Sequence, residues 1–286
     1  MVRRADPVAG TGEVLVRVVA ATVNPTDIAA RRGKTRGDAA PPYVPGWDFC
    51  GEVLDRGDGV DDLAVGQLVA GMIPWYEVAG RVGAYASHIA VPAEWAVPVP
   101  DGVDPVVAAT VPLNGLTAAQ ALDLLAVPAG ARLLVTGASG AVGGFAVQLA
   151  SAAGAQVTAL CSAGDEDWVR SCGARQVVLR GDGHPAAERF GHVFDAVPVG
   201  ADLLGWLDDG AVVVITRRIQ VTPERAIRHL PMLVRQDRAM LRELLAGVAA
   251  GRLVSRVAAV LPLADAAAAH RRAEAGGLRG KIVLRP

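Results

Sequence analysis

The residues of this chain most able to do chemistry form a glycine-rich turn near its middle. Three glycines recur at three-residue intervals, directly after the apolar run 132–136 and before a run of helical character at 141–153. Without a Cβ, backbone N–H groups at the start of a helix can lie against a diphosphate, and the turn can adopt unusual dihedral angles. A strand, this turn, a helix and a second strand at 156–160 together predict dinucleotide binding. A tight structural turn is the alternative. The residues expected to hold the diphosphate are Gly137, Ser139, Gly140, Ala141, Val142 and Gly143.

The end of the second strand predicts which dinucleotide binds. NAD-specific sites place Asp or Glu there to hold the ribose hydroxyls, whereas this chain has Cys161 and Ser162. A neutral turn with a hydroxyl accommodates a 2′-phosphate, which a carboxylate would repel, and Arg180 at the end of the third strand can reach it. The acidic run 165–167 counts against this interpretation unless it serves the N-terminus of the next helix. We predict NADPH rather than NADH.

The elements that must position this turn divide the chain in two. The first hundred residues contain short strands punctuated by Gly and Pro, at 14–19, 51–54, 67–71 and 85–91. From residue 106 onward strands and helices alternate, which predicts a parallel sheet covered on both faces. Its strands are expected at 132–136, 156–160, 177–179, 192–195 and 211–216, and its helices at 113–125, 141–153 and 165–172. After residue 237 we expect a helix to about 250, a strand at 254–261, a helix at 264–275 and a strand at 281–284.

The composition excludes several classes of function. Of 286 residues 52% are hydrophobic and 20% charged, with a formal net charge of -1, so nothing predicts nucleic acid or an anionic membrane as a partner. No apolar run approaches the ~20 residues of a membrane helix, and residues 1–10 lack the apolar stretch of a secretory signal. The three scattered cysteines predict a cytoplasmic protein with reduced thiols.

Several motifs in order along the chain resemble one family. They are EVLVRV at 13–18, VNPTD at 23–27, VPGWDFCGEV at 44–53, GLTA at 115–118, AVQLA at 146–150 after the glycine turn, FDAV at 194–197 and RGKIVL at 279–284. With these motifs the chain resembles the medium-chain dehydrogenase/reductase superfamily, and within it the zinc-free quinone oxidoreductase branch that includes the zeta-crystallins. The resemblance implies an α/β fold with a GroES-like β-barrel domain at 1–105 and 252–286, and a Rossmann doubly wound parallel-sheet domain at 106–251.

The resemblance also implies roles for single residues, each with a structural alternative. Asn24 is expected beside the nicotinamide ribose, or in a turn formed with Pro25. Thr117 is expected near the carboxamide, or as a hydroxyl at a helix N-terminus. Lys281 is expected near the cofactor, or as a solvated surface charge. The residues expected to line the nicotinamide channel are Val197, Ile215 and Thr216.

The resemblance further implies an enzyme without zinc. Zinc-dependent members have Cys near the Asn24 position and His-Glu after the glycine at Gly46, where this chain has Trp47 and Asp48. The five histidines show no metal-ligand spacing with the cysteines. What remains is hydride transfer driven chiefly by positioning, from the cofactor to a quinone or an α,β-unsaturated carbonyl compound.

The candidates for catalysis and substrate contact are few. Asn24 and Tyr76 are the candidate catalytic residues, and Trp75 and Tyr76 are candidates for contacting a flat substrate. Aromatic packing beneath a loop is the alternative for this pair. Ala29 stands where relatives often have a tyrosine, so no proton donor is assigned at that position.

Two other functions stay open. Relatives usually carry roughly two more strands before residues 7–10. Either the barrel is abbreviated or the start is a truncation, and in both cases strand edges would be exposed. A nucleotide-binding regulatory or structural protein with vestigial catalysis would bind NADPH without turnover. An enoyl or enone reductase of a biosynthetic pathway would differ in substrate only. By analogy with the family we expect a homodimer, paired through the edge of the Rossmann sheet at the strand 211–216.

Overall fold

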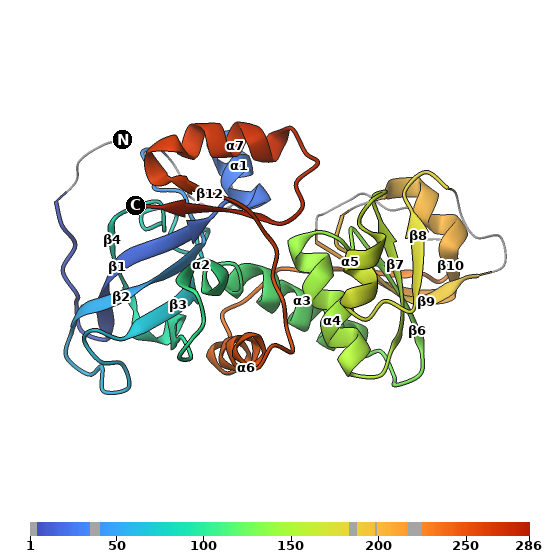
Figure 1. Cartoon of the computed structure of the whole chain (residues 1–286), viewed down its shortest axis with the longest axis horizontal. Helices are drawn as coiled ribbons and strands as arrows, with labels where there is room; N and C mark the ends of the chain where they lie inside the picture. Colours follow the sequence, from blue (N-terminus) through green and yellow to red (C-terminus); the bar gives the residue numbers. More distant parts are fainter. Residues whose placement is uncertain (1–4, 35–40, 183–187, 198, 217–224) are drawn as a thin grey trace. The chain divides into compact units, whose positions relative to one another are not determined.

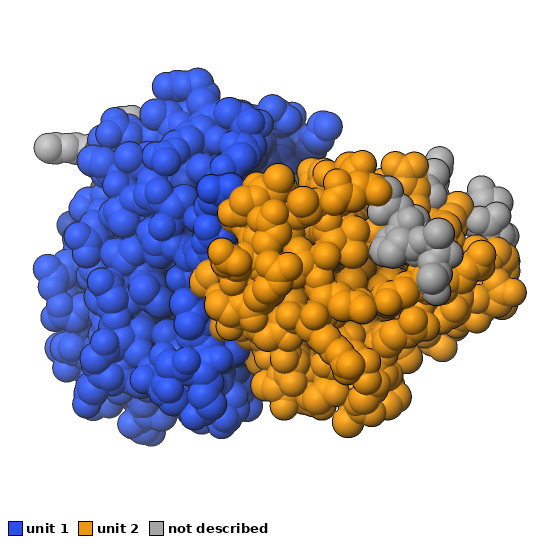
Figure 2. Space-filling view, turned by 45° about the vertical axis from the view of Figure 1, so that its right-hand side comes forward, with its two compact units in different colours: residues 1–113, 235–286 blue, residues 114–234 orange. Residues whose placement is uncertain are grey.

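The structure is a computed structural model that describes residues 5–34, 41–182, 188–197, 199–216 and 225–286. The chain forms two compact units, shown in different colours in Figure 2: unit 1 comprises residues 1–113 and 235–286, and unit 2 comprises residues 114–234. The domain boundaries predicted from the sequence lie after residues 105 and 251. The two divisions differ mainly in helix α6 (Arg238–Ala249), which lies in unit 1.

Unit 1 is built on a seven-stranded sheet. Its spatial order is β12-β13-β1-β2-β3-β5, and β4 pairs with β1. Neighbouring strands are antiparallel except β12 and β13, which run parallel. The strands are β1 (Glu13–Thr22), β2 (Asp48–Arg56), β3 (Leu68–Met72), β4 (His88–Pro92), β5 (Ala96–Pro98), β12 (Val257–Pro262) and β13 (Lys281–Arg285). Its other helices are α1 (Pro25–Arg31), α2 (Pro105–Ala108), α7 (Ala266–Glu274) and the short 3-10 turns η1 (Ala93–Trp95) and η3 (Leu263–Asp265).

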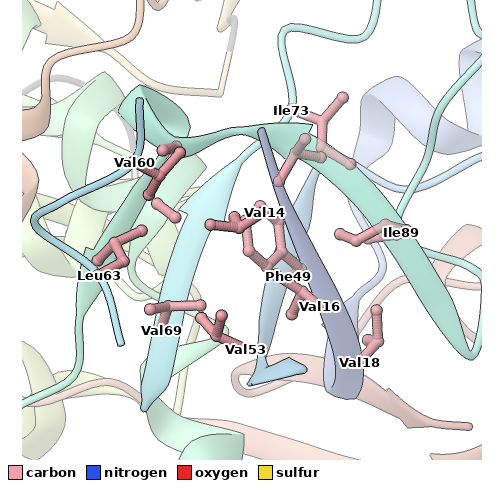
Figure 3. Close-up of a cluster of buried hydrophobic side chains, with 14 of the residues drawn as sticks. Val14, Val16, Val18, Phe49, Val53, Val60, Leu63, Val69, Ile73 and Ile89 are labelled. Atoms are coloured by element: carbon pink, nitrogen blue, oxygen red, sulfur yellow. The ribbon is translucent and has the colours of Figure 1, made fainter. Parts of the chain in front are cut away.

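The core of unit 1 follows from the alternation of residues along β1. Val14, Val16 and Val18 are buried and Arg17 is exposed, as expected of a strand with one face on a core. Side chains from the neighbouring strands and the loop after β2 complete this core, including Phe49, Val53, Val60, Leu63, Val69, Ile73 and Ile89 (Figure 3). This packing fixes the end of β1 and the start of β2, where several candidate site residues lie.

Helices from opposite ends of the sequence also meet in unit 1. α1 and α7 lie side by side (Figure 1), and Arg31 and Arg32 of the first region both pair with Glu274. The Arg32 Nη2 to Glu274 Oε1 distance is 2.7 Å. The segment after Asn24 is therefore anchored to the C-terminal part of the chain.

Unit 2 contains the predicted parallel sheet. Six parallel strands lie in the order β11-β10-β9-β6-β7-β8. The strands are β6 (Arg132–Thr136), β7 (Gln156–Cys161), β8 (Gln176–Leu179), β9 (Phe190–Asp195), β10 (Leu207–Ile215) and β11 (Arg228–Pro231). The helices are α3 (Pro112–Leu125), which begins in unit 1, α4 (Ala141–Ala152), α5 (Glu166–Ser171) and the 3-10 segment η2 (Gly200–Trp206). The strand order reverses between β6 and β9, and ligands of such sheets bind beyond the carboxyl ends of the strands at this reversal.

The prediction that the strand at 211–216 forms an edge of the sheet is wrong. That segment belongs to β10, which pairs with β9 on one side and with β11 on the other. β11 was not predicted because its four residues, RHLP, show no apolar alternation and end in proline. Residues 212–215 of β10 are therefore paired on both sides and offer no edge to a second copy of the chain.

In the described part of the chain, no helix combines the length and the apolar character that crossing a membrane requires. The three cysteines are free and buried.

Candidate cofactor and substrate site

The glycine turn leads into α4 and places the first N–H groups of that helix beside it. Gly140 caps this helix, and its N–H donates to Gly137 O at 2.9 Å. The bond from Gly144 N to Gly140 O, 2.8 Å long, is the first of the helix, so the N–H groups of residues 141–143 lie in the first turn, where a helix offers no acceptor. Gly140, Ala141 and Val142 are partly exposed. The positive end of α4 is therefore open to an anion.

The glycines of the turn have different functions. A Cβ on Gly143 would lie 2.2 Å from Gly137 O, so Gly143 is needed for close packing of the helix on the turn. Gly137 has a φ of 58°, and a Cβ there would come within 2.4 Å of Val197 Cγ2. A Cβ on Gly140 would meet only Gly137 O, at 3.2 Å. The absence of a side chain at Gly140 therefore leaves the space beside it open, and a diphosphate bound at the helix N-terminus fits there.

The predicted phosphate-selecting residues meet at the carboxyl ends of β7 and β8. Cys161 pairs with Leu179, and Arg180 N donates to Cys161 O at 2.8 Å. Ser162 and Arg180 are exposed, whereas Cys161 is buried. Burial, and then the nearby carboxylates Glu166 and Asp165, raise the pKa of the Cys161 thiol. Hydroxyl, guanidinium and carboxylates therefore share this edge of the sheet.

The loop after β9 is pinned beside the glycine turn by two threonines. Thr136 Oγ1 donates to Asp195 Oδ1 at 2.5 Å and accepts from Val197 N at 3.3 Å. Thr216 Oγ1 donates to Ala196 O at 3.0 Å. Burial raises the pKa of Asp195. Sequence reasoning assigned no role to Thr136 or Asp195, although both lie at strand ends next to the predicted turn.

The three residues predicted to line the nicotinamide channel differ in exposure. Val197 is 43% exposed, Thr216 is partly exposed, and Ile215 is 3% exposed within the core of unit 2. Val197 and Thr216 therefore present surface beyond the strand ends. Ile215 contributes to packing beneath them.

In unit 1, Asn24 is completely buried and joins two opposite charges. Lys281 Nζ donates to Val23 O at 2.7 Å and to Asn24 Oδ1. Asn24 Nδ2 donates to Asp48 Oδ2 at 2.7 Å and to Thr22 Oγ1 at 3.2 Å, and Thr22 Oγ1 donates to Asp48 Oδ2 at 2.6 Å. Both N–H bonds of the amide are used within this network. Lys281 is 6% exposed, so the alternative of a solvated surface charge is wrong.

The same region holds a second buried carboxylate, Asp27. It accepts from Asn24 N at 2.8 Å and from Gly46 N at 2.9 Å, which ties the start of α1 to the chain just before β2. Burial raises the pKa of Asp27 to about 7. Burial also raises the pKa of Asp48 and lowers that of Lys281, while the opposite charge of each partner counteracts the shift. Asp27 was missed, although an acid three residues after Asn24 is the spacing of a capping box.

Thr117 does not lie at a helix N-terminus. It is the sixth residue of α3, and it is buried. The first turn of that helix is instead held by Asp48, whose Oδ1 accepts from Leu113 N at 2.7 Å. The helix-start alternative for Thr117 is therefore wrong, and its contact with a carboxamide stays a prediction.

Four aromatic side chains of unit 1 form an edge-to-face series. The ring centroids of Tyr43 and Trp75 are 5.3 Å apart, those of Trp75 and Tyr76 5.7 Å, and those of Tyr76 and Trp47 5.1 Å. Trp75 is buried and its Nε1 donates to Val44 O at 2.6 Å, so it packs beneath the loop as the alternative interpretation expected. Tyr76 is partly exposed.

Two buried polar atoms of this region have no hydrogen-bond partner among the described residues. They are Thr26 Oγ1 and Trp47 Nε1. Their residues flank Asp27 and Gly46, which are bonded to each other. Sequence reasoning noted Trp47 only as a departure from the zinc pattern and assigned it no role.

The side chains present do not fit a zinc ion. Within the described residues, which exclude His184, no three His, Cys, Asp or Glu side chains gather closely enough to hold a metal. Asn24 and Trp47 offer an amide and an indole where thiolate and imidazole ligands would be needed. Asp48 is engaged by three hydrogen-bond donors, and the Lys281 ammonium is the cation that lowers its pKa.

Comparison with known proteins agrees with this architecture. Residues 10–101 match the alcohol dehydrogenase GroES-like domain, and residues 172–284 match the family described as zinc-binding dehydrogenase. The chain is 37% identical over 192 residues to the mitochondrial NAD(P)H oxidoreductase RTN4IP1 of Drosophila melanogaster, covering 59% of this chain and 46% of that protein. It is 28% identical over 308 residues to a chloroplast envelope quinone oxidoreductase homolog of Arabidopsis thaliana, covering 98% and 92%. The quinone oxidoreductase of Coxiella burnetii superposes with a TM-score of 0.89 at 25% identity, covering 99% and 93%.

The two family matches, the glycine turn and the near-complete superposition define the class of protein. The chain belongs to the medium-chain dehydrogenase/reductase superfamily of oxidoreductases, with a GroES-like domain and a Rossmann-type parallel-sheet domain. Within that superfamily its quinone oxidoreductase relatives place it in the zinc-free branch. The predicted family and fold class are confirmed.

Proposed function

We propose that this protein is an NADPH-dependent oxidoreductase that reduces a quinone or another α,β-unsaturated carbonyl compound without a metal. One observation carries the proposal. The start of α4 presents N–H groups beside a glycine whose missing side chain leaves the space open, at the reversal of strand order in a parallel sheet. When bound, the nicotinamide supplies a hydride. The quinone oxidoreductase relatives support the class of acceptor.

The residues of this chain then bind and orient. The turn 137–143 holds the diphosphate, and Ser162 and Arg180 at the ends of β7 and β8 receive the 2′-phosphate. Val197 and Thr216 line the way to the nicotinamide, beside the pinned loop after β9. Tyr76, which is partly exposed, contacts the flat acceptor, Trp75 packs behind it, and solvent water supplies the proton. The catalysis so described depends mainly on positioning.

In this proposal Asn24 acts as a positioning residue. Its amide is fixed between Lys281 and Asp48, so it holds the end of β1 and the start of α1 rigidly. Lys281 acts through the same network. Both residues position the surface that meets the nicotinamide ribose, and the amide N–H bonds are already used within unit 1.

Alanine substitutions at two glycines, Gly140 and Gly144, test the proposal directly. Gly140→Ala adds a methyl group where only Gly137 O lies within reach, at 3.2 Å, so we expect the fold to lose about 1 kcal/mol or less. The methyl group would occupy the place of the diphosphate, and the Kd for NADPH should rise about tenfold or more. Gly144→Ala is the matched control, because the nearest atom to its Cβ would be 3.8 Å away.

The measurement is calorimetric titration with NADPH and NADH, followed by NADPH oxidation with a panel of quinones, enones and enoyl thioesters. We expect tighter binding of NADPH, turnover with at least one acceptor, and no loss of turnover after dialysis against a chelator. Absence of binding to the unmodified protein would refute the proposal. Binding without turnover on the whole panel would favour a nucleotide-binding protein with vestigial catalysis.

A further inference from the structure

The Trp47 indole N–H differs from the other polar groups of its region. Trp47 is 4% exposed, and its Nε1 has no acceptor among the described residues. A buried donor without an acceptor costs about 1–3 kcal/mol. The hydroxyl of Thr26, also unpartnered, can rotate toward another acceptor. The indole N–H cannot, because its direction is fixed by the ring.

The backbone around Trp47 is held firmly. Asp27 Oδ1 accepts from Gly46 N at 2.9 Å, and Trp47 O accepts from Ile73 N at 2.6 Å. Asp48, the next residue, is bonded to Thr22, Asn24 and Leu113. The backbone of Trp47 is therefore fixed, and burial of its ring against Tyr76 limits the directions in which the indole N–H can point.

Of the rings beside Trp47, Tyr76 is partly exposed and so offers surface to a flat, electron-poor molecule. Its ring meets Tyr76 edge-on, with an interplanar angle of 79°, and Tyr76 in turn meets Trp75. Aromatic rings in such arrangements offer faces and edges to a further ring. The indole N–H of Trp75 is already used by Val44 O. Within this aromatic series, Trp47 is the residue whose N–H has no acceptor in the described part of the chain.

We propose that the Trp47 indole N–H donates a hydrogen bond to the carbonyl oxygen of the acceptor and so stabilises the negative charge that this oxygen gains during reduction. The inference rests on the proposed function and names the group that recognises its substrate class. Buried donors aimed at an oxygen where charge develops are among the largest contributions to catalysis.

The reaction balances without loss of the indole proton. Hydride addition forms a C–H bond at the acceptor carbon and brings two electrons. The conjugated π electrons move to the carbonyl oxygen, which becomes an enolate or phenolate oxygen. The acceptor is reduced and the nicotinamide oxidised. A proton from water then neutralises the product, while Trp47 keeps its N–H throughout.

The kinetic test compares two tryptophans of unit 1. Trp47→Phe keeps a ring but removes the N–H, and we expect kcat/KM for the acceptor to fall about 100-fold, with the Kd for NADPH changed less than about twofold. Trp95→Phe is the matched control, because Trp95 packs partly buried against the core of unit 1 and takes no part in the ring contacts described for the aromatic series. Trp47→His, which retains a ring N–H, should recover part of the loss.

A binding test needs neither turnover nor a variant of Trp47 itself. The protein is labelled with ¹⁵N at the indole nitrogens of its five tryptophans, saturated with NADP⁺ and titrated with 4-nitrophenolate, whose charged oxygen resembles that of the reduced acceptor. We expect one indole N–H resonance to move downfield. Phe variants of the other four tryptophans assign that resonance to Trp47 by elimination.

The outcomes separate the two proposals. If the protein binds NADPH and reduces an acceptor, but Trp47→Phe is as active as Trp95→Phe, the role of Trp47 is refuted and the proposed function stands. The same holds if nitrophenolate binds without moving the Trp47 resonance. If the unmodified protein binds no dinucleotide, the proposed function fails and the inference fails with it.

Discussion

The amide of Asn24 links an ammonium group and a carboxylate that lie in one buried cluster. Its Oδ1 accepts from Lys281 and its Nδ2 donates to Asp48. A neutral amide in this position forms a hydrogen bond with each charged group and adds no third charge to the cluster. Removing one charge of such a pair is costly, since the other is left buried and uncompensated.

Lys281→Met should therefore destabilise the protein by about 3–5 kcal/mol in urea unfolding. Adding Asp48→Asn removes the orphaned carboxylate and keeps an oxygen for Leu113 N, so the double variant should lose less than the sum of the two single losses. Arg285→Met, an exposed residue at the other end of β13, is the control and should change stability by about 0.5 kcal/mol or less. Additive losses would contradict the coupling.

Asp27 gives the protein a pH-dependent stability. Its pKa is about 7 in the folded protein and near 3.9 in an unfolded chain. Between these values the folded state holds the proton more tightly, so the free energy of unfolding falls as the pH rises from about 4 to about 7. Asp27→Asn lacks this titration. The stability of the unmodified protein relative to Asp27→Asn should fall by about 3 kcal/mol between pH 5 and pH 8 in urea titrations. A pH-independent difference would show that Asp27 keeps its ordinary pKa.

At the scale of single residues, the sequence predicted the diphosphate turn but not the buried network. The turn is local, so glycine spacing between a strand and a helix is enough to predict it. Asn24 and Lys281 are 257 residues apart, and each was singled out by family resemblance alone. Their contact depends on the pairing of β1 with β13, and no short-range pattern predicts which distant charges a sheet will bring together.

Among the elements, the ends of β7 and β8 are where the choice of dinucleotide is made. Arg180 is exposed at the carboxyl end of β8, one residue beyond the partner of Cys161. Arg180→Gln should raise the KM for NADPH about tenfold and leave the KM for NADH unchanged, because only NADPH carries the 2′-phosphate. Arg175→Gln is the matched control, exposed at the opposite end of the same strand. Equal effects on both dinucleotides would contradict a phosphate contact for Arg180.

Elements with a strong apolar pattern in the sequence were predicted well, and elements with a weak pattern were missed. β6 has the bounds predicted for it, 132–136, because four consecutive buried residues and the following glycine mark a central parallel strand. α1 was missed because Asn24-Pro25 was weighed only as a cofactor contact or a turn, although proline is common in the first turn of a helix. β11 was missed because its four residues show no apolar alternation. The strand that forms the edge of the sheet was therefore missed as well.

The whole molecule consists of two units that each have a hydrophobic core of their own, one formed by the antiparallel sheet and one by the parallel sheet. Units with separate cores can open independently. A ligand that binds one of them stabilises that unit by mass action, and the other unit gains only as far as its opening depends on the first.

NADPH at about 100 times its Kd should stabilise unit 2 by about 2.7 kcal/mol. In hydrogen-exchange mass spectrometry, the amides of β6 and β7 should then exchange about 100-fold more slowly, because exchange of such amides requires opening of the unit. The amides of β2 and β3 in unit 1 should change much less, and at the same NADPH concentration Gly140→Ala should reduce the protection to about tenfold or less. Equal slowing in both units would show that they open together. No slowing in β6 and β7 would mean that the dinucleotide does not bind where the glycine turn meets α4.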